Sequence, residues 1–163
     1  MIIRPANFSD IYIIHQLANK IWPVTYKNII SDEQINFMLD KMYSEEALTN
    51  QINAEIEFLL AEDENKPIGF AAYSLTAEPP NKIYKLHKLY ILPTEHGKGT
   101  GKKLVDEVIK LAQPKGGKVL ELNVNRANPA LGFYQKLGFE IYQEVDIPYF
   151  KFVMNDYVMR ISL

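Results

Sequence analysis

The chain has 163 residues, of which 47% are hydrophobic and 23% charged, and it carries a formal net charge of −2 and no cysteine. This length predicts one domain, residues 1–163, that buries a core without cross-links. The absence of cysteine excludes a disulfide scaffold, a thiolate–zinc site and a cysteine nucleophile, and three histidines are too few to suggest a metal site. The near-neutral charge argues against a nucleic-acid-binding protein, which usually carries a strong basic excess.

After a short strand over residues 1–4, the first third of the chain is expected to be helical. Ser9 stands where an N-cap residue is expected before a helix over residues 10–22. Ser31 and Gln34 form a capping-box sequence before a second helix, and Ser44 precedes a third. The apolar residues at helical spacing on these helices are Ile13, Ile14, Leu17, Ala18, Ile21, Ile35, Met38, Leu39, Met42, Leu48 and Ile52.

The rest of the chain alternates strands with two helices. The expected strands are residues 57–63, 67–77, 82–92, 119–124, 139–145 and 149–163. The first two form a hairpin, and Pro93 ends the third before a helix over residues 102–113. Asn128 as N-cap and Pro129 at the first helical position predict a second helix that stops at Gly138. This order predicts one α/β domain without an internal repeat or a linker.

Charge is unevenly distributed along the chain. Residues 31–65 contain ten acidic residues and one basic residue, Lys41, whereas residues 98–118 contain six lysines and two acidic residues. Two interpretations stay open at this point. Either both segments are solvated helix faces, or the first segment faces a cation and the second faces an anion.

No targeting or membrane segment is expected. The N-terminal sequence MIIRPANFSD reaches a charge at Arg4 and a proline at Pro5, so it has no apolar run typical of a signal peptide. No stretch approaches the ~18 consecutive apolar residues that a spanning helix requires. The sequence therefore predicts a cytoplasmic protein without a membrane partner.

The most informative motif is the glycine-rich segment His96-Gly-Lys-Gly-Thr-Gly101, between a predicted strand and a predicted helix. Backbone N–H groups of such a turn at a helix N-terminus bind anions such as phosphate, and glycines let the main chain come close. The spacing excludes a Walker A loop, and a dinucleotide-binding fingerprint would need glycine where Lys102 stands. A flexible turn without a ligand is the alternative.

Two segments resemble signatures of the GNAT superfamily of N-acetyltransferases. Residues 86–109, LHKLYILPTEHGKGTGKKLVDEVI, are similar to the family's acetyl-CoA-binding motif, and residues 125–139, NRANPALGFYQKLGF, are similar to its later signature. His96 stands where the motif has Arg or Gln. The helical front with Trp22 and Tyr26, and the closing YVMRISL, resemble bacterial polyamine and small-amine acetyltransferases of the PaiA type.

The resemblance implies a GNAT (acyl-CoA N-acyltransferase) fold, an α/β domain whose mixed, mostly antiparallel central sheet is flanked by helices. It also implies acetyl-CoA as co-substrate, no metal, and a homodimer as a common assembly. The glycine-rich loop would hold the diphosphate, and the preceding strand would pair with the pantetheine arm and offer the oxyanion an N–H from Tyr90 or Ile91. The residues expected to bind the cofactor are Leu89, Tyr90, Ile91, His96, Gly97, Lys98, Gly99, Thr100, Gly101, Lys102, Asn128 and Tyr134. For Asn128, a helix cap without a cofactor contact stays open.

The chemistry that the resemblance implies is a direct attack of an amine on the thioester carbonyl of acetyl-CoA. Tyr134 matches the position of the family's usual general acid. A phenol with a pKa of about 10 stays protonated at neutral pH and can protonate the leaving thiolate. His87 matches a position that accepts the amine's proton, although a lone histidine on a strand is often structural. Strict alternation would put His87 on one strand face with Lys85 and Leu89.

For the acceptor, the sequence favours a small amine or a polyamine, with a peptide or protein amine as a further possibility. The acidic segment 31–65 would suit a cation, and Trp22, Tyr26 and Tyr149 are the expected substrate contacts. Two other classes stay open. One is a catalytically silent CoA-binding sensor or interaction module on the same fold, and the other is a nucleotide-binding regulator that uses the same loop.

Overall fold

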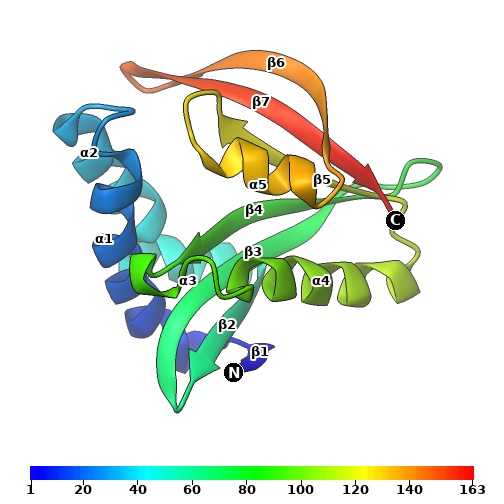
Figure 1. The fold of residues 1–163 in the computed structure, drawn as a ribbon, viewed down its shortest axis with the longest axis horizontal. Coiled ribbons are helices and arrows are strands. Elements are labelled where there is room, and N and C mark those ends of the chain that lie inside the picture. The colour runs from blue at the N-terminus through cyan, green and yellow to red at the C-terminus, as the bar shows by residue number, and fades with distance from the viewer.

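One seven-stranded sheet forms the centre of the computed structural model, which describes all 163 residues (Figure 1). Its strand order is β1-β2-β3-β4-β5-β7-β6. Every neighbouring pair is antiparallel except β4 and β5, which run parallel, so the predicted mixed, mostly antiparallel sheet is confirmed. The strands are β1 (Ile2–Pro5), β2 (Glu57–Asp63), β3 (Lys66–Ala77), β4 (Ile83–Ile91), β5 (Val119–Asn125), β6 (Glu140–Tyr149) and β7 (Phe152–Ser162).

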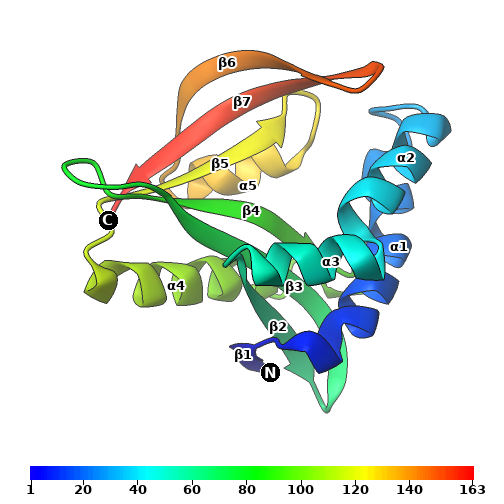
Figure 2. The same cartoon turned by 180° about the vertical axis from the view of Figure 1, so that it is seen from behind.

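Helices cover both faces of this sheet. Figure 1 shows α4 and α5 in front of it, and Figure 2, seen from behind, shows α3 on the opposite face with α1 and α2 beside it. The helices are α1 (Ile11–Tyr26), α2 (Asp32–Tyr43), α3 (Glu45–Asn53), α4 (Thr100–Ala112) and α5 (Ala130–Lys136), with short 3₁₀ turns at Phe8–Asp10, Pro93–Glu95 and Gln113–Lys115. None of the helices combines the length and the apolar composition that a membrane-spanning helix requires.

Alternation along the strands divides the core into two layers. Leu59 and Ala71 face the side of α4, whereas Phe58 and Phe70, their neighbours in sequence, face α1, α2 and α3. The second layer is closed by the apolar faces that helical spacing predicts for the first three helices. Its buried helical members are Ile11, Ile14, Leu17, Ala18, Ile21, Trp22, Ile35, Met38, Leu39, Tyr43 and Leu48.

The regular alternation is broken in the middle of β4. Ala72 of β3 pairs with Lys88, but the next residue of β3, Tyr73, pairs with Leu86. His87 is therefore the extra residue of a β-bulge, in which two residues of one strand oppose one residue of the other. The residues before and after His87 therefore lie on opposite faces of β4, whereas strict alternation would put them on the same face.

The bulge changes which side chains share a face of β4. Leu89 packs against the core beneath α4, whereas Lys88 lies over the ring of Tyr43 on the opposite side. The prediction that His87 and Leu89 share a face is wrong, because strict alternation does not continue through a bulge. His87 instead lies beside Ser74, whose Oγ is 2.7 Å from the His87 Nε2.

The same region of the sheet opens between β4 and β5. These parallel strands pair only over Ile83–Leu86 and Val119–Leu122. Beyond this point β4 pairs with β3 and β5 pairs with β7, and the two strands no longer pair with each other. The second half of β4 therefore presents an unpaired main-chain edge inside the sheet.

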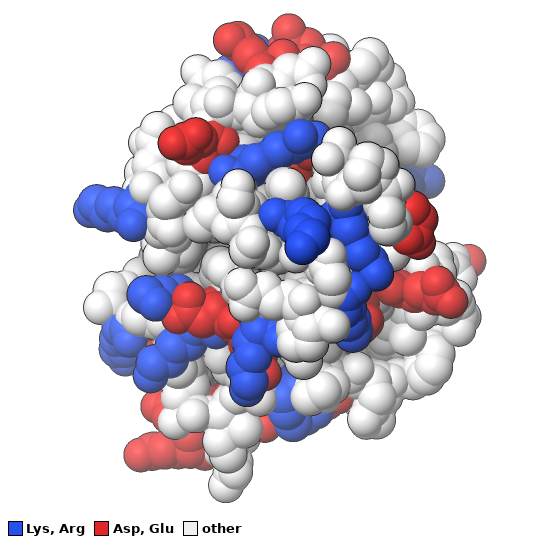
Figure 3. Space-filling view, turned by 90° about the vertical axis from the view of Figure 1, so that its right-hand side faces the viewer, with Lys and Arg blue, Asp and Glu red and all other residues white.

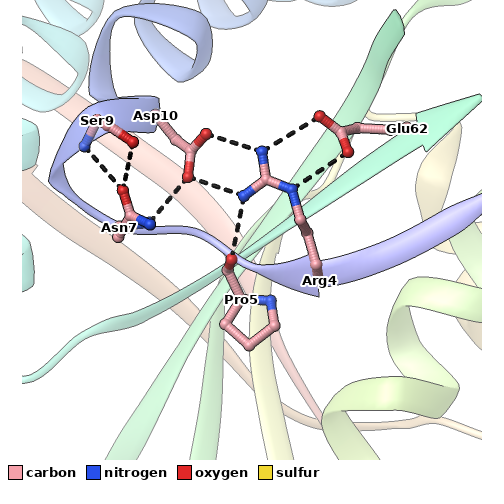
Figure 4. Close-up of polar contacts among 6 residues, drawn as sticks. All are labelled: Arg4, Pro5, Asn7, Ser9, Asp10 and Glu62. Carbon is pink, nitrogen blue, oxygen red and sulfur yellow. Dashed lines mark hydrogen bonds and ion pairs between the residues drawn. The ribbon is translucent and has the colours of Figure 1, made fainter. Parts of the chain in front are cut away.

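A polar network fixes the start of the first helical segment (Figure 4). The Asn7 side chain accepts the N–H of Ser9 at 2.9 Å, and the Asp10 carboxylate accepts the N–H of Asn7 at 3.0 Å. Arg4 donates two hydrogen bonds of 2.9 Å to Asp10 and two of 3.2 Å to Glu62 of β2. The prediction of Ser9 as N-cap is wrong, because Arg4 holds Asp10 where it completes a capping box with Asn7.

The other helix starts are close to those expected from the sequence. Ser31 and Ser44 cap α2 and α3, each accepting a backbone N–H three residues later at 3.1 Å. The Asn128 side chain accepts the N–H of Ala130 at 2.9 Å, so Asn128 does cap α5. Helix α4 begins at Thr100, two residues before its predicted start, and so includes the end of the glycine-rich segment.

Candidate active site

A cavity of about 1060 Å³ lies where β4 and β5 diverge and reaches both faces of the sheet. One end, here the glycine arm, is bordered by Gly97, Gly99, Thr100, Gly101 and Lys102. The other end, here the helical arm, is bordered by Trp22, Tyr26, Tyr43, Gln51, His87, Lys88 and Tyr90. Tyr134 and Asn128 also line the cavity, so it brings together most of the residues that the sequence nominates.

The glycine arm is formed by backbone that only glycine adopts easily. Gly97 and Gly99 have φ angles of +77° and +82°, in the left-handed region, and no atom lies within 4 Å of a Cβ built on either of them. Gly101 lies closer to its neighbours, because a Cβ there would meet Ile91 and Phe133 side-chain atoms at 3.0 Å. The first N–H groups of α4 have no partner within the helix, and they provide the donors for an anion.

The main chain at the end of β4 faces the cavity at alternate residues. Leu92 donates its N–H to a carbonyl of β3 at 2.9 Å, and in an antiparallel ladder Tyr90 must also turn its main chain toward β3. The N–H and C=O groups of Leu89 and Ile91 therefore face the gap, and His96 Nε2 lies 3.2 Å from the Ile91 oxygen. Of the two predicted oxyanion donors, Ile91 has a free N–H, whereas the prediction for the Tyr90 N–H is wrong because β3 uses that edge.

Aromatic side chains dominate the helical arm. The rings of Trp22 and Tyr26 are 4.4 Å apart, and Trp22 lies 5.4 Å from Tyr43 and 5.7 Å from Tyr90. The hydroxyl groups of Tyr26 and Tyr90 form a hydrogen bond of 2.9 Å. Burial raises the pKa of Tyr26 and of Tyr90, so both hydroxyls are neutral donors at physiological pH.

Tyr134 is carried by α5 and is buried where the two core layers approach the cavity. Its ring makes edge contacts with Phe133 at 5.2 Å and Phe139 at 5.7 Å, which hold it in place. Burial raises the pKa of Tyr134 well above its usual value. The phenol therefore stays protonated at neutral pH and keeps a proton to donate.

His87 lies in the cavity wall with a positively charged neighbourhood. Burial, followed by the charges of Lys85 and Lys88, lowers the pKa of His87 to about 4. Its Nε2 is 2.7 Å from the hydroxyl of Ser74. His87 is thus neutral at physiological pH and is a weak base.

Two charged residues of the cavity were missed in the sequence. Asp156 of β7 is 9% exposed, and burial raises the pKa of its carboxyl group. Lys88 is 8% exposed, and burial lowers its pKa to about 8. The alternation along β7 could have revealed Asp156, because Phe152, Met154 and Asp156 share the inward face of this strand. A charged residue stands there where an apolar one is expected. Lys88 could not be found in this way, because the bulge beside it breaks the pattern.

Some nominated residues lie away from the cavity. Tyr149 is not among its lining residues, because it sits at the tip of the β6–β7 hairpin, 6.2 Å from the ring of Phe37. Lys98 turns outward to an ion pair with Glu95. Tyr149 therefore does not line the cavity, whereas Lys98, whose partner Glu95 does line it, stays predicted to add positive charge beside the glycine arm.

The acidic segment does not reach the cavity either. None of its ten acidic residues lines the walls, because the apolar faces of α2 and α3 point inward and their charges point to solvent. Figure 3 draws the side of the molecule away from α2, at the C-terminal end of α4, where Lys and Arg side chains lie among Asp and Glu side chains. Five of these acids lie on the solvated faces of α2 and α3, whereas Glu57 and Glu62 of β2 form ion pairs with Lys115 and Arg4. None of the ten contacts the cavity, so the segment does not form a cation site there. No group of three or more His, Asp or Glu side chains is arranged to hold a metal ion.

The sequence and the fold are similar to those of known acetyltransferases. Residues 26–147 match the family model of the acetyltransferase (GNAT) domain. A spermidine N(1)-acetyltransferase of Thermoplasma acidophilum is 34% identical over 145 residues, which cover 85% of this chain and 88% of the relative. A peptidyl-lysine N-acetyltransferase of Salmonella typhimurium is 34% identical over 58% of this chain and 65% of its own.

A solved structure agrees with this assignment over nearly the whole length. The crystal structure of PaiA N-acetyltransferase from Thermoplasma acidophilum in complex with coenzyme A superposes with a TM-score of 0.85 and 29% identity. The match covers 99% of this chain and 98% of that one. The glycine arm, the open edge of β4 and Tyr134 thus occur in a chain with the family's fold and signatures. The chain belongs to the GNAT family and is an acetyl-CoA-dependent N-acetyltransferase of amines.

Proposed function

We propose that this enzyme transfers the acetyl group of acetyl-CoA directly to the primary amine of a small acceptor held in the helical arm. The observation that carries this proposal is the continuous cavity, which joins the glycine arm to the helical arm through the gap between β4 and β5. Both reactants then meet at Tyr134 without a covalent enzyme intermediate. The relative named for spermidine supports a small amine, and the peptidyl-lysine relative makes a peptide amine the second choice.

The residues of the glycine arm and of β4 suit coenzyme A. The N–H groups at Gly97 to Lys102 bind the diphosphate at the positive end of α4. The main chain of Leu89 and Ile91 pairs with the pantetheine arm, as an added strand would. The Ile91 N–H donates to the thioester oxygen, and this hydrogen bond strengthens as negative charge develops there.

Tyr134 acts as the general acid. When the amine nitrogen bonds to the carbonyl carbon, the carbon–sulfur bond breaks and the sulfur takes the phenolic proton. The raised pKa of Tyr134 guarantees that this proton is present. The leaving group departs as a thiol, which avoids a buried thiolate.

Asp156 accepts the amine's proton in this scheme, and His87 does not. The carboxylate of Asp156 lines the cavity, attracts an ammonium group, and is a stronger base than an exposed carboxylate because burial raises its pKa. Burial and two lysines lower the pKa of His87 to about 4, which makes it a weaker base than a free imidazole, and its Nε2 already bonds to Ser74. We assign His87 the role of positioning the bulged turn of β4 against β3.

A thiol-release screen over amines, with the acetylated product identified by mass, tests the proposal. Tyr134→Phe is expected to lower kcat by about 100-fold, typical of a lost general acid, while the Kd of acetyl-CoA stays within about threefold. Tyr12→Phe is the matched control, because Tyr12 is exposed on α1 and lies outside the cavity. Acetyl-CoA binding without any acetylated product would favour the CoA-sensor alternative instead.

The compartment and the assembly extend this proposal. A chain without cysteine needs no oxidising environment, and we place the enzyme in the cytoplasm. A homodimer stays a prediction, which sedimentation at micromolar concentration tests.

A further inference from the structure

Lys88 is a buried lysine without a partner in the helical arm. The residue is 8% exposed, and its Nζ, which keeps a small accessible surface, lies 4.5 Å from the centroid of the Tyr43 ring without a protein hydrogen bond or an ion pair. Buried lysines are normally paired, because an isolated ammonium group loses its hydration. Burial is the cause that lowers the pKa of Lys88, and no neighbouring carboxylate offsets it.

A second buried donor lies against the same ring. The indole Nε1 of Trp22 has no hydrogen-bond partner, and the Trp22 ring is 5.4 Å from that of Tyr43. Tyr43 is itself fully buried, and its raised pKa keeps its hydroxyl protonated. Ammonium and indole groups donate hydrogen bonds and accept none, whereas Gln51 Oε1 in the same arm is a buried acceptor without a partner. The arm therefore offers the donors Lys88 and Trp22 to an acceptor of hydrogen bonds, and Gln51 Oε1 to a donor.

The surrounding charges favour a negative ligand here. The acidic residues that line the cavity are Glu95, which pairs with Lys98 beside the glycine arm, and Asp156, which lies across the gap on β7. Within the helical arm the ionisable neighbours of Lys88 are Lys85, His87 and the tyrosines, and none of them carries a negative charge at neutral pH, whereas the charge of Asp156 acts on Tyr26. A polycation that filled this arm would bring an ammonium group against an unpaired ammonium group.

We infer that Lys88, Trp22 and Tyr43 form a carboxylate-binding site, and that the acceptor is an ω-amino acid rather than a polyamine. This inference rests on the proposed function and names its substrate class. Lys88 and Tyr90 lie on one face of β4 two residues apart, which is about 7 Å along a strand. The Tyr90 hydroxyl meets that of Tyr26 at 2.9 Å, further along the arm from Lys88. A carboxylate then lies at Lys88 and the amine lies toward the paired hydroxyls of Tyr26 and Tyr90, and experiment sets the length of the methylene chain that joins the two groups.

Three acceptors of equal chain length test the inference. These are 5-aminopentanoate, 1,5-diaminopentane and pentylamine, which end in a carboxylate, an ammonium and a methyl group. The unmodified enzyme is expected to have its highest kcat/KM with 5-aminopentanoate. Lys88→Met is expected to lower the ratio of kcat/KM for 5-aminopentanoate to that for pentylamine by about 30-fold, mainly through KM, as expected when one partner of a buried charge pair is removed.

Lys27→Met is the matched control, because Lys27 is exposed at the end of α1 and lies outside the cavity. It is expected to leave the ratio unchanged. A preference for 1,5-diaminopentane that Lys88→Met does not alter would overturn the inference and leave the proposed function standing.

A binding measurement separates the inference from turnover. Pentanoate has no amine, so calorimetric titration of pentanoate into the CoA-loaded enzyme reports the carboxylate site alone. Binding that Lys88→Met weakens by about 30-fold and Lys27→Met does not weaken supports the site, even if no amine in the screen is acetylated. Equal binding by the unmodified enzyme and Lys88→Met refutes it.

Discussion

Replacing Lys88 with methionine is expected to stabilise the protein. A folded-state pKa of about 8, against 10.5 for an unperturbed lysine, means that the folded chain holds the Lys88 proton less tightly than the unfolded chain does. At 1.36 kcal/mol for each pKa unit, burial of this ammonium costs about 3 kcal/mol at pH 7. Methionine fills a similar volume without a charge, so Lys88→Met is expected to recover most of that free energy of unfolding.

The pH dependence of this gain identifies its cause. Below pH 8 the lysine is protonated in both states and the full cost is present. Between pH 8 and 10.5 the unfolded chain holds more protons than the folded chain, so the Lys88 contribution to stability rises with pH and the cost disappears. The difference between Lys88→Met and the unmodified protein should therefore fall from about 3 kcal/mol at pH 7 toward zero near pH 10.5. Because both proteins share the same tyrosines, the titration of those tyrosines largely cancels in this difference.

Urea unfolding of both proteins at a series of pH values measures the effect. At pH 7 a gain of about 3 kcal/mol corresponds to a Tm higher by roughly 6–12 °C for a chain of this size. Lys27→Met, on the exposed end of α1, should stay within about 0.5 kcal/mol of the unmodified protein. A destabilised Lys88→Met, or a gain that is the same at pH 7 and pH 10.5, would refute the description of Lys88 as an unpaired buried ammonium.

Four further substitutions probe the site and the fold. Asp156→Asn is expected to remove the acidic limb of the pH dependence of kcat/KM, because this limb reports protonation of the Asp156 carboxylate. His87→Ala should retain the limb, and the opposite result would make His87 the proton acceptor. Gly101→Ala is expected to weaken acetyl-CoA binding at least about tenfold in a calorimetric titration. The methyl group of the alanine would meet side-chain atoms 3.0 Å away and displace the first turn of α4. Unaltered affinity would show that this turn does not bind the cofactor. Arg4→Met should lower the free energy of unfolding by about 2 kcal/mol, since Asp10 loses its charged donors, and a change below 0.5 kcal/mol would mark the network as inconsequential.

Local sequence signals predicted the parts of the fold that depend on local chemistry. The apolar faces of the first three helices, the caps at Ser31 and Ser44, and the glycine arm all follow from residues that are close in sequence. Apolar residues likewise predicted the strands, and β2, β3, β4 and β5 bury their apolar side chains against the helices.

The features that local signals missed depend on distant partners. The bulge at His87 exists because Ala72 and Tyr73 pair with residues on either side of it, and no pattern within β4 records that register. Asn7 replaces Ser9 as the cap because Arg4 places Asp10 within reach.

The charge pattern misled for a related reason. A count of acidic residues along the sequence does not say on which side of α2 and α3 they lie, and the amphipathic packing of both helices turns them outward. Two buried charged residues, Lys88 and Asp156, line the cavity instead. Neither belongs to a run of like charges, so composition alone could not reveal them.

Direct transfer within one cavity is tested by exchange of labelled coenzyme A into acetyl-CoA in the absence of any amine. A ternary mechanism predicts no exchange without amine, together with intersecting initial-velocity lines when both substrates are varied. Rapid exchange without amine, with parallel lines, would reveal an acetylated enzyme intermediate and would contradict transfer straight from coenzyme A to the acceptor.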